Sequence, residues 1–274
     1  MRHLIVTADD FGLSADVNAA VIEGHRDGIV TAASLMIAGA ARDEAIALAR
    51  AHPTLRVGLH LVLVDGKSTL PPEQIPDLVS PEGDFPASPL AAGLRYQFSS
   101  RVRRQLALEI AAQLTAFRQT GLVLAHVDGH HHLHLHPVVL SILSGLAAEY
   151  GIPAIRLPAE ELRTAVALDP RRAARDLVWS GVFRALRRAG ERRLRRAGVL
   201  FADRVYGLHA TGQIDEDYLL RLVPRMRGRR VELYAHPSRS PAGSGLRERA
   251  ALVSPRVRAA IHSAGFALGP EPQP

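Results

Sequence analysis

A run of histidines, H-V-D-G-H-H-H-L-H-L-H over residues 126–136, holds six of the chain's 13 histidines. Imidazole binds metals when neutral and exchanges protons near neutral pH. In an extended strand the even-numbered members would share one face, whereas in a helix His130 would pair with His134 and His132 with His136. The run is therefore a metal site, a pH-sensitive cluster or a set of structural polar side chains, and periodicity alone does not decide between them.

Other polar side chains stand at the ends of apolar segments. Asp9 and Asp10 follow R-H-L-I-V-T-A, His60 lies within L-R-V-G-L-H-L-V-L-V, and His236 with Pro237 ends R-R-V-E-L-Y-A-H-P. Taken singly, a carboxylate pair is often a helix cap, and a histidine in an apolar strand is more often a hydrogen-bonded core residue. In a barrel of parallel strands, however, the carboxyl ends meet at one mouth. The sequence therefore predicts one site built from these ends and from the histidine run.

Metal-assisted hydrolysis is the chemistry that these residue types favour. The chain contains no cysteine, so a metal ion would be held by His, Asp, Glu or water. One Asp and two His leave positions open for water and substrate, and suit Zn²⁺ or another transition ion. Of two adjacent carboxylates, one can bind the cation while the other takes a proton from water, and a distant His can protonate the leaving group.

Apolar stretches alternate with helical patterns along most of the chain. The predicted strands are residues 2–8, 30–38, 55–64, 121–128, 151–158 and 229–237, and the predicted helices are 15–26, 41–52, 101–120, 137–150 and 215–226. Residues 65–100, rich in proline and glycine, are predicted as a long loop over the site. The alternation predicts an α/β fold with mainly parallel strands, closed as a barrel or open as a sheet.

Positive charge is concentrated in residues 171–196, where ten arginines face only Asp176 and Glu191, while the whole chain has a net charge of +7. Apolar residues recur there at helical spacing, which predicts a basic helical insertion at about 159–200 within a single domain of residues 1–274. Such a helix either contacts an anionic membrane or packs on the barrel with its charges in water. Nucleic acid is not an expected partner, because no nucleic-acid-binding motif accompanies the arginines.

Neither a signal peptide nor a membrane-spanning helix is predicted. Acidic residues appear by Asp9, too early for the apolar core of a signal peptide, and no apolar run approaches the roughly 18 residues of a spanning helix. We expect a cytoplasmic protein, peripheral at the inner face of the membrane if the basic segment binds lipid. The tail from about residue 269, which ends P-E-P-Q-P, is expected to be disordered.

Four motifs in this order carry a family resemblance: V-T-A-D-D-F-G-L-S, V-G-L-H-L-V-L-V-D-G, H-V-D-G-H-H-H-L-H and E-L-Y-A-H-P. Together they resemble the YdjC-type carbohydrate deacetylases, which include the chito-oligosaccharide deacetylases. The likeness runs from residue 2 to about 265. Through T-A-A-S-L-M and L-H-L-V-L-V-D-G it is strongest to the branch associated with hopanoid biosynthesis.

The resemblance implies a distorted (β/α) TIM-like barrel that uses one divalent cation, Zn²⁺ or Mg²⁺. Asp10, His60 and His130 match the metal ligands of the family. Asp9 matches its catalytic base, and His236 matches the acid near the leaving amine. The implied reaction removes acetyl from an N-acetylglucosamine-type sugar, giving acetate and a free amino sugar.

Further side chains are assigned supporting roles. Arg156, in A-I-R-L-P, matches the position from which related deacetylases orient the base by an ion pair. Asp128 is expected to orient a ligating histidine, and His132 and His134 are expected in the pocket wall or behind the ligands.

The hopanoid-branch likeness implies a glycosylated hopanoid lipid as the substrate. Two alternatives stay open. One is a deacetylase of soluble chito-oligosaccharides, and the other is a non-catalytic metal- or sugar-binding barrel. The Asp9-Asp10 pair argues against the second alternative, because binding alone needs no base.

Overall fold

Seven strands form one sheet in the computed structural model, which describes residues 1–158, 162–168 and 173–270. The strands are β1 (Arg2–Phe11), β2 (Ala32–Leu35), β3 (Arg56–Leu61), β4 (Val127–Gly129), β5 (Arg204–Tyr206), β6 (Arg230–Ala235) and β7 (Phe266–Leu268). Their order is β4-β3-β2-β1-β6-β5, with β7 also paired to β1, and every pairing is parallel. The predicted α/β fold of mainly parallel strands is confirmed.

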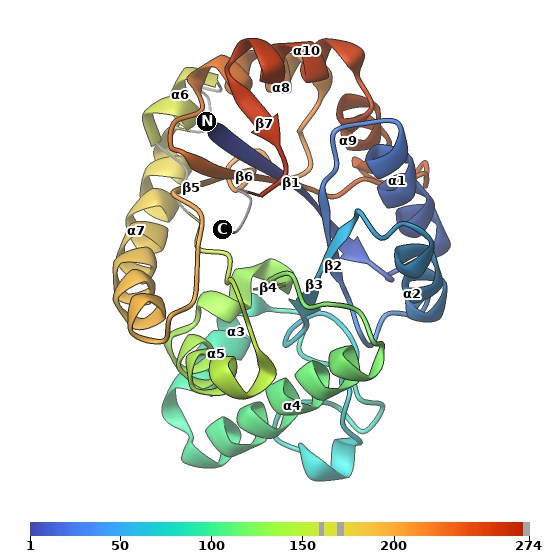
Figure 1. The fold of residues 1–274 in the computed structure, drawn as a ribbon. Helices are drawn as coiled ribbons and strands as arrows, with labels where there is room; N and C mark the ends of the chain where they lie inside the picture. Colours follow the sequence, from blue (N-terminus) through green and yellow to red (C-terminus); the bar gives the residue numbers. More distant parts are fainter. Residues whose placement is uncertain (159–161, 169–172, 271–274) are drawn as a thin grey trace.

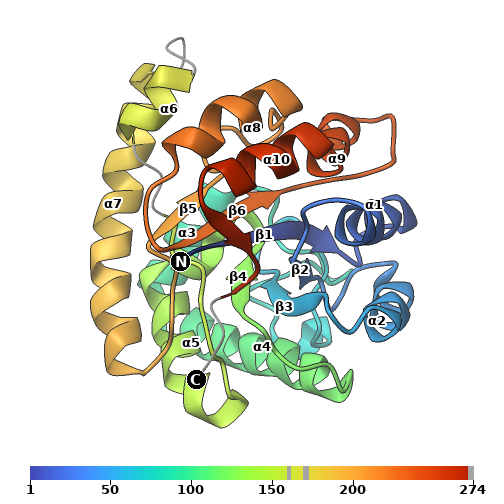
Figure 2. The ribbon, with the colours of Figure 1, turned by 45° about the horizontal axis from the view of Figure 1, so that its top comes forward.

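The sheet curls around a shared interior, with helices on its outer side (Figures 1 and 2). The helices are α1 (Ala15–Arg26), α2 (Arg42–Ala51), α3 (Pro89–Phe98), α4 (Ser100–Gln119), α5 (Pro137–Tyr150), α6 (Leu162–Leu168), α7 (Ala173–Arg196), α8 (Glu216–Leu222), α9 (Gly245–Leu252) and α10 (Pro255–Ser263). Short 3₁₀ turns add η1 (Pro72–Gln74), η2 (His130–Leu135) and η4 (Val223–Arg225). Between β4 and β5 the wall continues through the single bridges Val127↔Ile155 and Ala154↔Leu200. The result is a distorted TIM-like barrel.

Local sequence signals set several element limits. The Ser14 side chain accepts a hydrogen bond from the Val17 amide and starts α1. Pro137 opens α5, where a missing amide hydrogen costs nothing, and Gly151 ends it in the left-handed conformation. These limits agree with the predicted helices at 15–26 and 137–150.

Other predicted elements are wrong in detail. The segment 65–100, predicted as a loop, contains η1 and α3, and α3 begins with the cap Ser88 followed by Pro89. The strand predicted at 121–128 shortens to β4, and 151–158 contributes only bridges. The strand predicted at 229–237 is β6, and a further strand that was not predicted, β7, follows two helices later.

The register of β1 against β2 shifts at the site. Ala8 pairs with Ala33 and Phe11 with Leu35, so both Asp9 and Asp10 stand opposite the one residue between them. Asp10 adopts a left-handed backbone with φ 63°. Successive residues of a regular strand point to opposite faces, and a bulge breaks that alternation. The bulge lets two neighbouring carboxylates face one pocket.

The described part of the basic segment packs on the barrel. Gly190 of α7 lies so close to Leu157 and Leu140 that an added Cβ would stand 3.0 and 3.1 Å from their methyl groups. Leu194 is fully buried. Residues 159–161 and 169–172 of the predicted insertion, and 271–274 of the predicted tail, lie outside the described residues. Within the described ranges, no helix is both long enough and apolar enough to span a membrane.

Candidate active site

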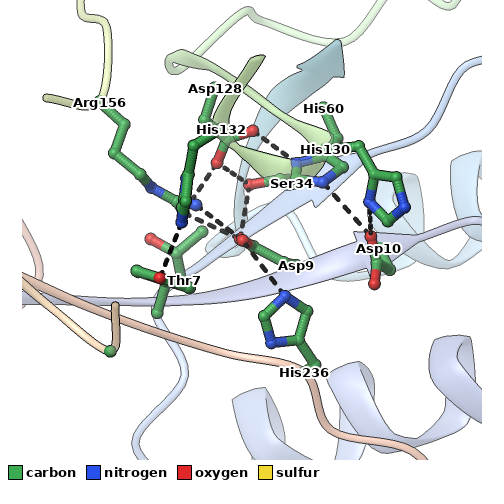
Figure 3. A network of polar contacts seen from close by, with 12 residues as sticks. Thr7, Asp9, Asp10, Ser34, His60, Asp128, His130, His132, Arg156 and His236 are labelled. Atoms are coloured by element: carbon green, nitrogen blue, oxygen red, sulfur yellow. Dashed lines mark hydrogen bonds and ion pairs between the residues drawn. The ribbon is translucent and has the colours of Figure 1, made fainter. Parts of the chain in front are cut away.

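A pocket of about 570 Å³ opens at the carboxyl ends of the strands. Its wall includes Asp9, Asp10, His60, His130, His132, Phe183, His209 and His236. The strand-end groups singled out in the sequence therefore reach one pocket, although β1, β3, β4 and β6 are far apart along the chain (Figure 3).

Asp10, His60 and His130 form one side of this pocket. The Asp10 Oδ1 atom lies 3.3 Å from His60 Nε2 and 3.2 Å from His130 Nδ1. The three side chains offer ligand atoms within 4.8 Å of one another. Asp10 Oδ1 and His60 Nε2 are buried, and neither finds a hydrogen-bond partner among the residues that the structure describes. One carboxylate and two imidazoles, with polar atoms left unsatisfied between them, fit a divalent cation such as Zn²⁺.

The protonation of this group is set by its neighbours. His60 Nδ1 lies 2.7 Å from Asp128 Oδ1, the carboxylate–histidine contact that commonly orients a ligating imidazole. Burial opposes a charge on His60, but Asp128 and Asp10 outweigh it and raise the pKa of His60 to about 10. Burial also opposes charge on Asp10, yet contacts with His130 and His60 hold its pKa well below the usual value. A cation at His60 Nε2 would displace a proton, so its binding should weaken as the pH falls.

Arg156 organises the opposite side of the pocket. Its Nη1 and Nη2 donate to the two oxygens of Asp9 at 2.7 and 2.8 Å, a bidentate pair. Nη2 also lies 2.7 Å from Asp128 Oδ2, and Nε donates to Glu232 Oε1 at 2.8 Å. Burial alone would lower the pKa of Arg156, but the three carboxylates raise it well above the usual value. Arg156 is thus paired with Asp9 in the structure.

Three polar residues that sequence reasoning missed complete this side. Ser34, opposite the bulge, donates to Asp128 Oδ2 at 2.7 Å and to Asp9 Oδ1 at 3.3 Å. Thr7 donates to Glu232 Oε1 at 2.9 Å. Glu232 carried a usable signal, because it lies four residues before His236 in a strand and therefore on the same face.

His236, the residue after β6, faces Asp9. Its Nε2 atom is 3.9 Å from Asp9 Oδ2, and its side chain is 30% exposed. Its backbone amide donates to Glu248 Oε2 at 2.6 Å, which fixes the turn after β6. Burial raises the pKa of Glu248 although its contact with His236 opposes this. His236 and Asp9 therefore border the same open space from two strands.

The rest of the histidine run follows neither the strand nor the helix pattern. His131 and His132 adopt left-handed backbones with φ 50° and 57° inside η2. His132 lines the pocket and meets the Tyr234 hydroxyl at 2.8 Å, whereas His134 is fully buried and donates Nε2–H to the Arg156 carbonyl at 2.9 Å. Burial lowers the pKa of His134 to about 4.

A family model described as YdjC-like protein matches residues 3–263. The chain belongs to this family. A carbohydrate deacetylase of Brevibacillus brevis is 43% identical over 155 residues, covering 57% of this chain and 59% of the relative. A chitooligosaccharide deacetylase of Serratia marcescens is 34% identical over 163 residues, covering 59% of this chain and 62% of the relative. The matched segments thus span less than two thirds of either relative.

Solved structures share the fold of this YdjC-like protein over nearly its whole length. A structure from Enterococcus faecalis, described as a putative cellobiose-phosphate cleavage protein, aligns with a TM-score of 0.75 and 25% identity over 98% of this chain and 97% of its own. A lactam utilization protein from Thermus thermophilus aligns with a TM-score of 0.50 and 17% identity over 97% and 98% of the two chains. The second likeness concerns the fold alone.

Proposed function

We propose that this protein is a metal-dependent hydrolase that removes the acetyl group from an N-acetylated amino sugar. The observation that carries the proposal is one pocket in which Asp9, held by Arg156, faces the unsatisfied Asp10–His60–His130 group. The names of the relatives, carbohydrate and chitooligosaccharide deacetylases, support the same reaction. Water is added across the amide bond, and acetate and a free amine are the products.

The cation belongs to the Asp10 side. Asp10, His60 and His130 would hold it, and it would polarise the acetamide carbonyl and make a nearby water more acidic. The donor set favours Zn²⁺, while Mg²⁺ stays the alternative that the family resemblance implies. Asp128 contributes by fixing the His60 ring through the 2.7 Å contact at Nδ1, which leaves Nε2 facing Asp10.

The proton transfers belong to the Arg156 side. Arg156 holds both Asp9 oxygens in place, and a carboxylate has lone pairs beyond those that accept from a guanidinium, so Asp9 can still take a proton from the attacking water. His236, which is partly exposed and lies 3.9 Å from Asp9, would protonate the departing amine. Proton acceptor and proton donor thus border one reaction space.

The finer substrate in this proposal is an N-acetylglucosaminyl lipid, a glycosylated hopanoid, on the strength of the motif likeness to that branch. Soluble chito-oligosaccharides are the alternative substrates. A non-catalytic metal- or sugar-binding barrel is disfavoured, because binding alone would need no second carboxylate, Asp9, beside the cation site.

The Arg-rich helix α7 is the proposed contact with anionic membrane. Arg184, Arg188 and Arg192 are exposed on it, while Phe183 of the same helix lines the pocket. Arg187, by contrast, bonds to Glu191 and to barrel carbonyls and is not free for lipid. Only some of the arginines of α7 are therefore available to bind a membrane. We expect weaker binding to anionic vesicles when Arg184, Arg188 and Arg192 are changed to Gln.

The decisive experiment measures acetate release. Protein purified without chelator is analysed for its bound metal, then supplied with an N-acetylglucosaminyl lipid and, separately, with chito-oligosaccharides. Release from either supports the deacetylase, and the faster of the two decides the substrate. A metal-loaded protein that releases no acetate from any N-acetylated amino sugar, lipid-linked ones included, would overturn the proposal.

A further inference from the structure

Helix α3 presents an apolar face to solvent. Leu90, Leu94 and Phe98 are 74%, 55% and 81% exposed. Their spacing of four residues places them on one side of the helix. The other side is buried through Ala92 and Tyr96, whose hydroxyl donates to the Leu63 carbonyl at 2.6 Å. The helix is therefore fixed to the barrel through Ala92 and Tyr96 and turns three apolar side chains outward.

This apolar face stands beside the mouth of the active site. Pro89, the first residue of α3, lines the pocket that holds Asp9 and Asp10. The helix also contacts η2, the turn that carries the histidine run. Phe183 of α7 lines the same pocket, so α3 and α7 both border its opening. Any surface that binds the exposed face of α3 would therefore also lie next to the opening of the pocket.

The charged residues of α3 and of the start of α4 are all arginines. From Phe85 to Leu108 the sequence has no Asp or Glu, and the four cations of this stretch are all exposed. They are Arg95, Arg101, Arg103 and Arg104. One of them, Arg101, pairs with Asp77 at 2.6 Å. Apolar side chains flanked by arginine are the composition of helices that lie in the interface of an anionic bilayer.

We propose that α3 is an interfacial helix that seats Leu90, Leu94 and Phe98 at the headgroup–acyl boundary of an anionic lipid bilayer. The proposal rests on the proposed function, which gives the site a lipid-linked sugar. With α3 seated, the pocket opens toward the headgroup layer. The N-acetyl sugar can then enter while its lipid anchor stays in the membrane.

A second copy of the chain fits this face less well. A twofold contact through α3 would place the same patch against itself. The arginines of the two copies would then approach one another, and the segment from Phe85 to Leu108 offers no carboxylate to pair with them. Lipid phosphates supply the missing negative charge.

The test is co-sedimentation of the full-length, metal-loaded protein with vesicles of phosphatidylcholine, with and without phosphatidylglycerol. We expect binding to the anionic vesicles and a loss of at least about tenfold when Leu90, Leu94 and Phe98 are all changed to Ser. Val123→Ser is the matched control, because Val123 is 87% exposed and lies outside α3. It should bind like the unchanged protein, and thermal unfolding checks that each variant is folded.

Three results would overturn the proposal. One is absence of binding to anionic vesicles by the unchanged protein. Another is full binding by the α3 variant, with loss only when Arg184, Arg188 and Arg192 of α7 are changed to Gln. The third is a dimer, seen by light scattering, that the α3 variant converts to monomers. Vesicle binding needs no turnover, so a protein that binds vesicles but releases no acetate would count against the proposed function alone.

Discussion

Asp9 and Asp10 are neighbours in the chain, yet the first is fully paired with an arginine and the second belongs to a group with unsatisfied polar atoms. Asp9 lies in a closed ion cluster in which Arg156 contacts three carboxylates, those of Asp9, Asp128 and Glu232. Asp10 lies in an open cluster in which its own Oδ1 and His60 Nε2 are buried without hydrogen-bond partners in the described chain. The first region is complete in protein atoms, whereas we propose that a cation completes the second. Changes in the first should therefore affect folding and proton transfer, and changes in the second should affect metal content.

The largest effect is expected from breaking the closed cluster. Arg156→Leu leaves three buried carboxylates without their cation, and we expect a loss of about 3–5 kcal/mol in the free energy of unfolding. Urea unfolding at neutral pH measures it. Arg118→Leu, an exposed arginine over Tyr150, is the control and should cost no more than about 1 kcal/mol. Equal losses in the two variants would show that the cluster is not a folding unit.

The two carboxylates can be separated by matched substitutions. Asp9→Asn should lower kcat by about 10²–10⁴-fold, because the base is removed, and leave metal content unchanged. Asp10→Asn should abolish tight metal binding, because the charged ligand is removed while Asn still accepts the left-handed backbone at φ 63°. Acetate release and elemental analysis give the two readouts.

The contrast between Asp9 and Asp10 would be wrong if both variants lost the same property, or if Asp9→Asn lost metal and Asp10→Asn lost only rate. An Asp9→Asn protein with a near-normal rate would remove Asp9 from the role of base. An Asp10→Asn protein that keeps its metal would place the cation elsewhere.

Acid should lower the stability of the fold through a buried neutral histidine next to the closed cluster, His134, whose Nε2–H donates to the Arg156 carbonyl. His134 has its pKa lowered to about 4 by burial, while its unfolded value is 6.5. Between these two pH values the unfolded chain takes up a proton that the folded chain excludes. The contribution of His134 to the free energy of unfolding is therefore fully present above pH 6.5 and is lost as the pH drops toward 4. The contribution is roughly 3 kcal/mol. Urea unfolding across this range should show the decline, and a His134→Gln protein should show a shallower one.

The smallest effect is expected at Ser34, which lies between the two regions. Ser34→Ala removes the donor to Asp128 and to Asp9 and should cost roughly 1 kcal/mol of stability, with a several-fold loss of kcat. Metal content should not change, because the hydrogen bonds of Ser34 reach no member of the open cluster. Metal loss in this variant would mean that the two regions are one cooperative unit.

Much of the open cluster was predictable from sequence, because carboxyl ends of parallel strands converge whatever their separation in the chain. Asp10 and His130 follow apolar segments, His60 lies within one, and the structure brings the three together. The closed cluster was less accessible. Arg156 was found only through family resemblance, and Glu232 was missed although its spacing from His236 places both on one face of the strand.

Backbone departures were the hardest features to predict. The bulge at Asp10 and the left-handed pair His131 and His132 leave no periodic trace, since side-chain patterns assume regular dihedral angles. Helix α3 was missed for a different reason. Its exposed side carries Leu90, Leu94 and Phe98, so the apolar pattern that identifies a surface helix is inverted there.

Because of the bulge in β1, the site depends on the number of residues between Ala8 and Phe11 as well as on their types. Two residues occupy the space opposite Ser34 where a regular ladder has one. Deleting a single residue between Ala8 and Phe11 would restore the regular ladder and leave only one carboxylate on the pocket side. A one-residue deletion here would therefore remove base or ligand while leaving the sheet intact.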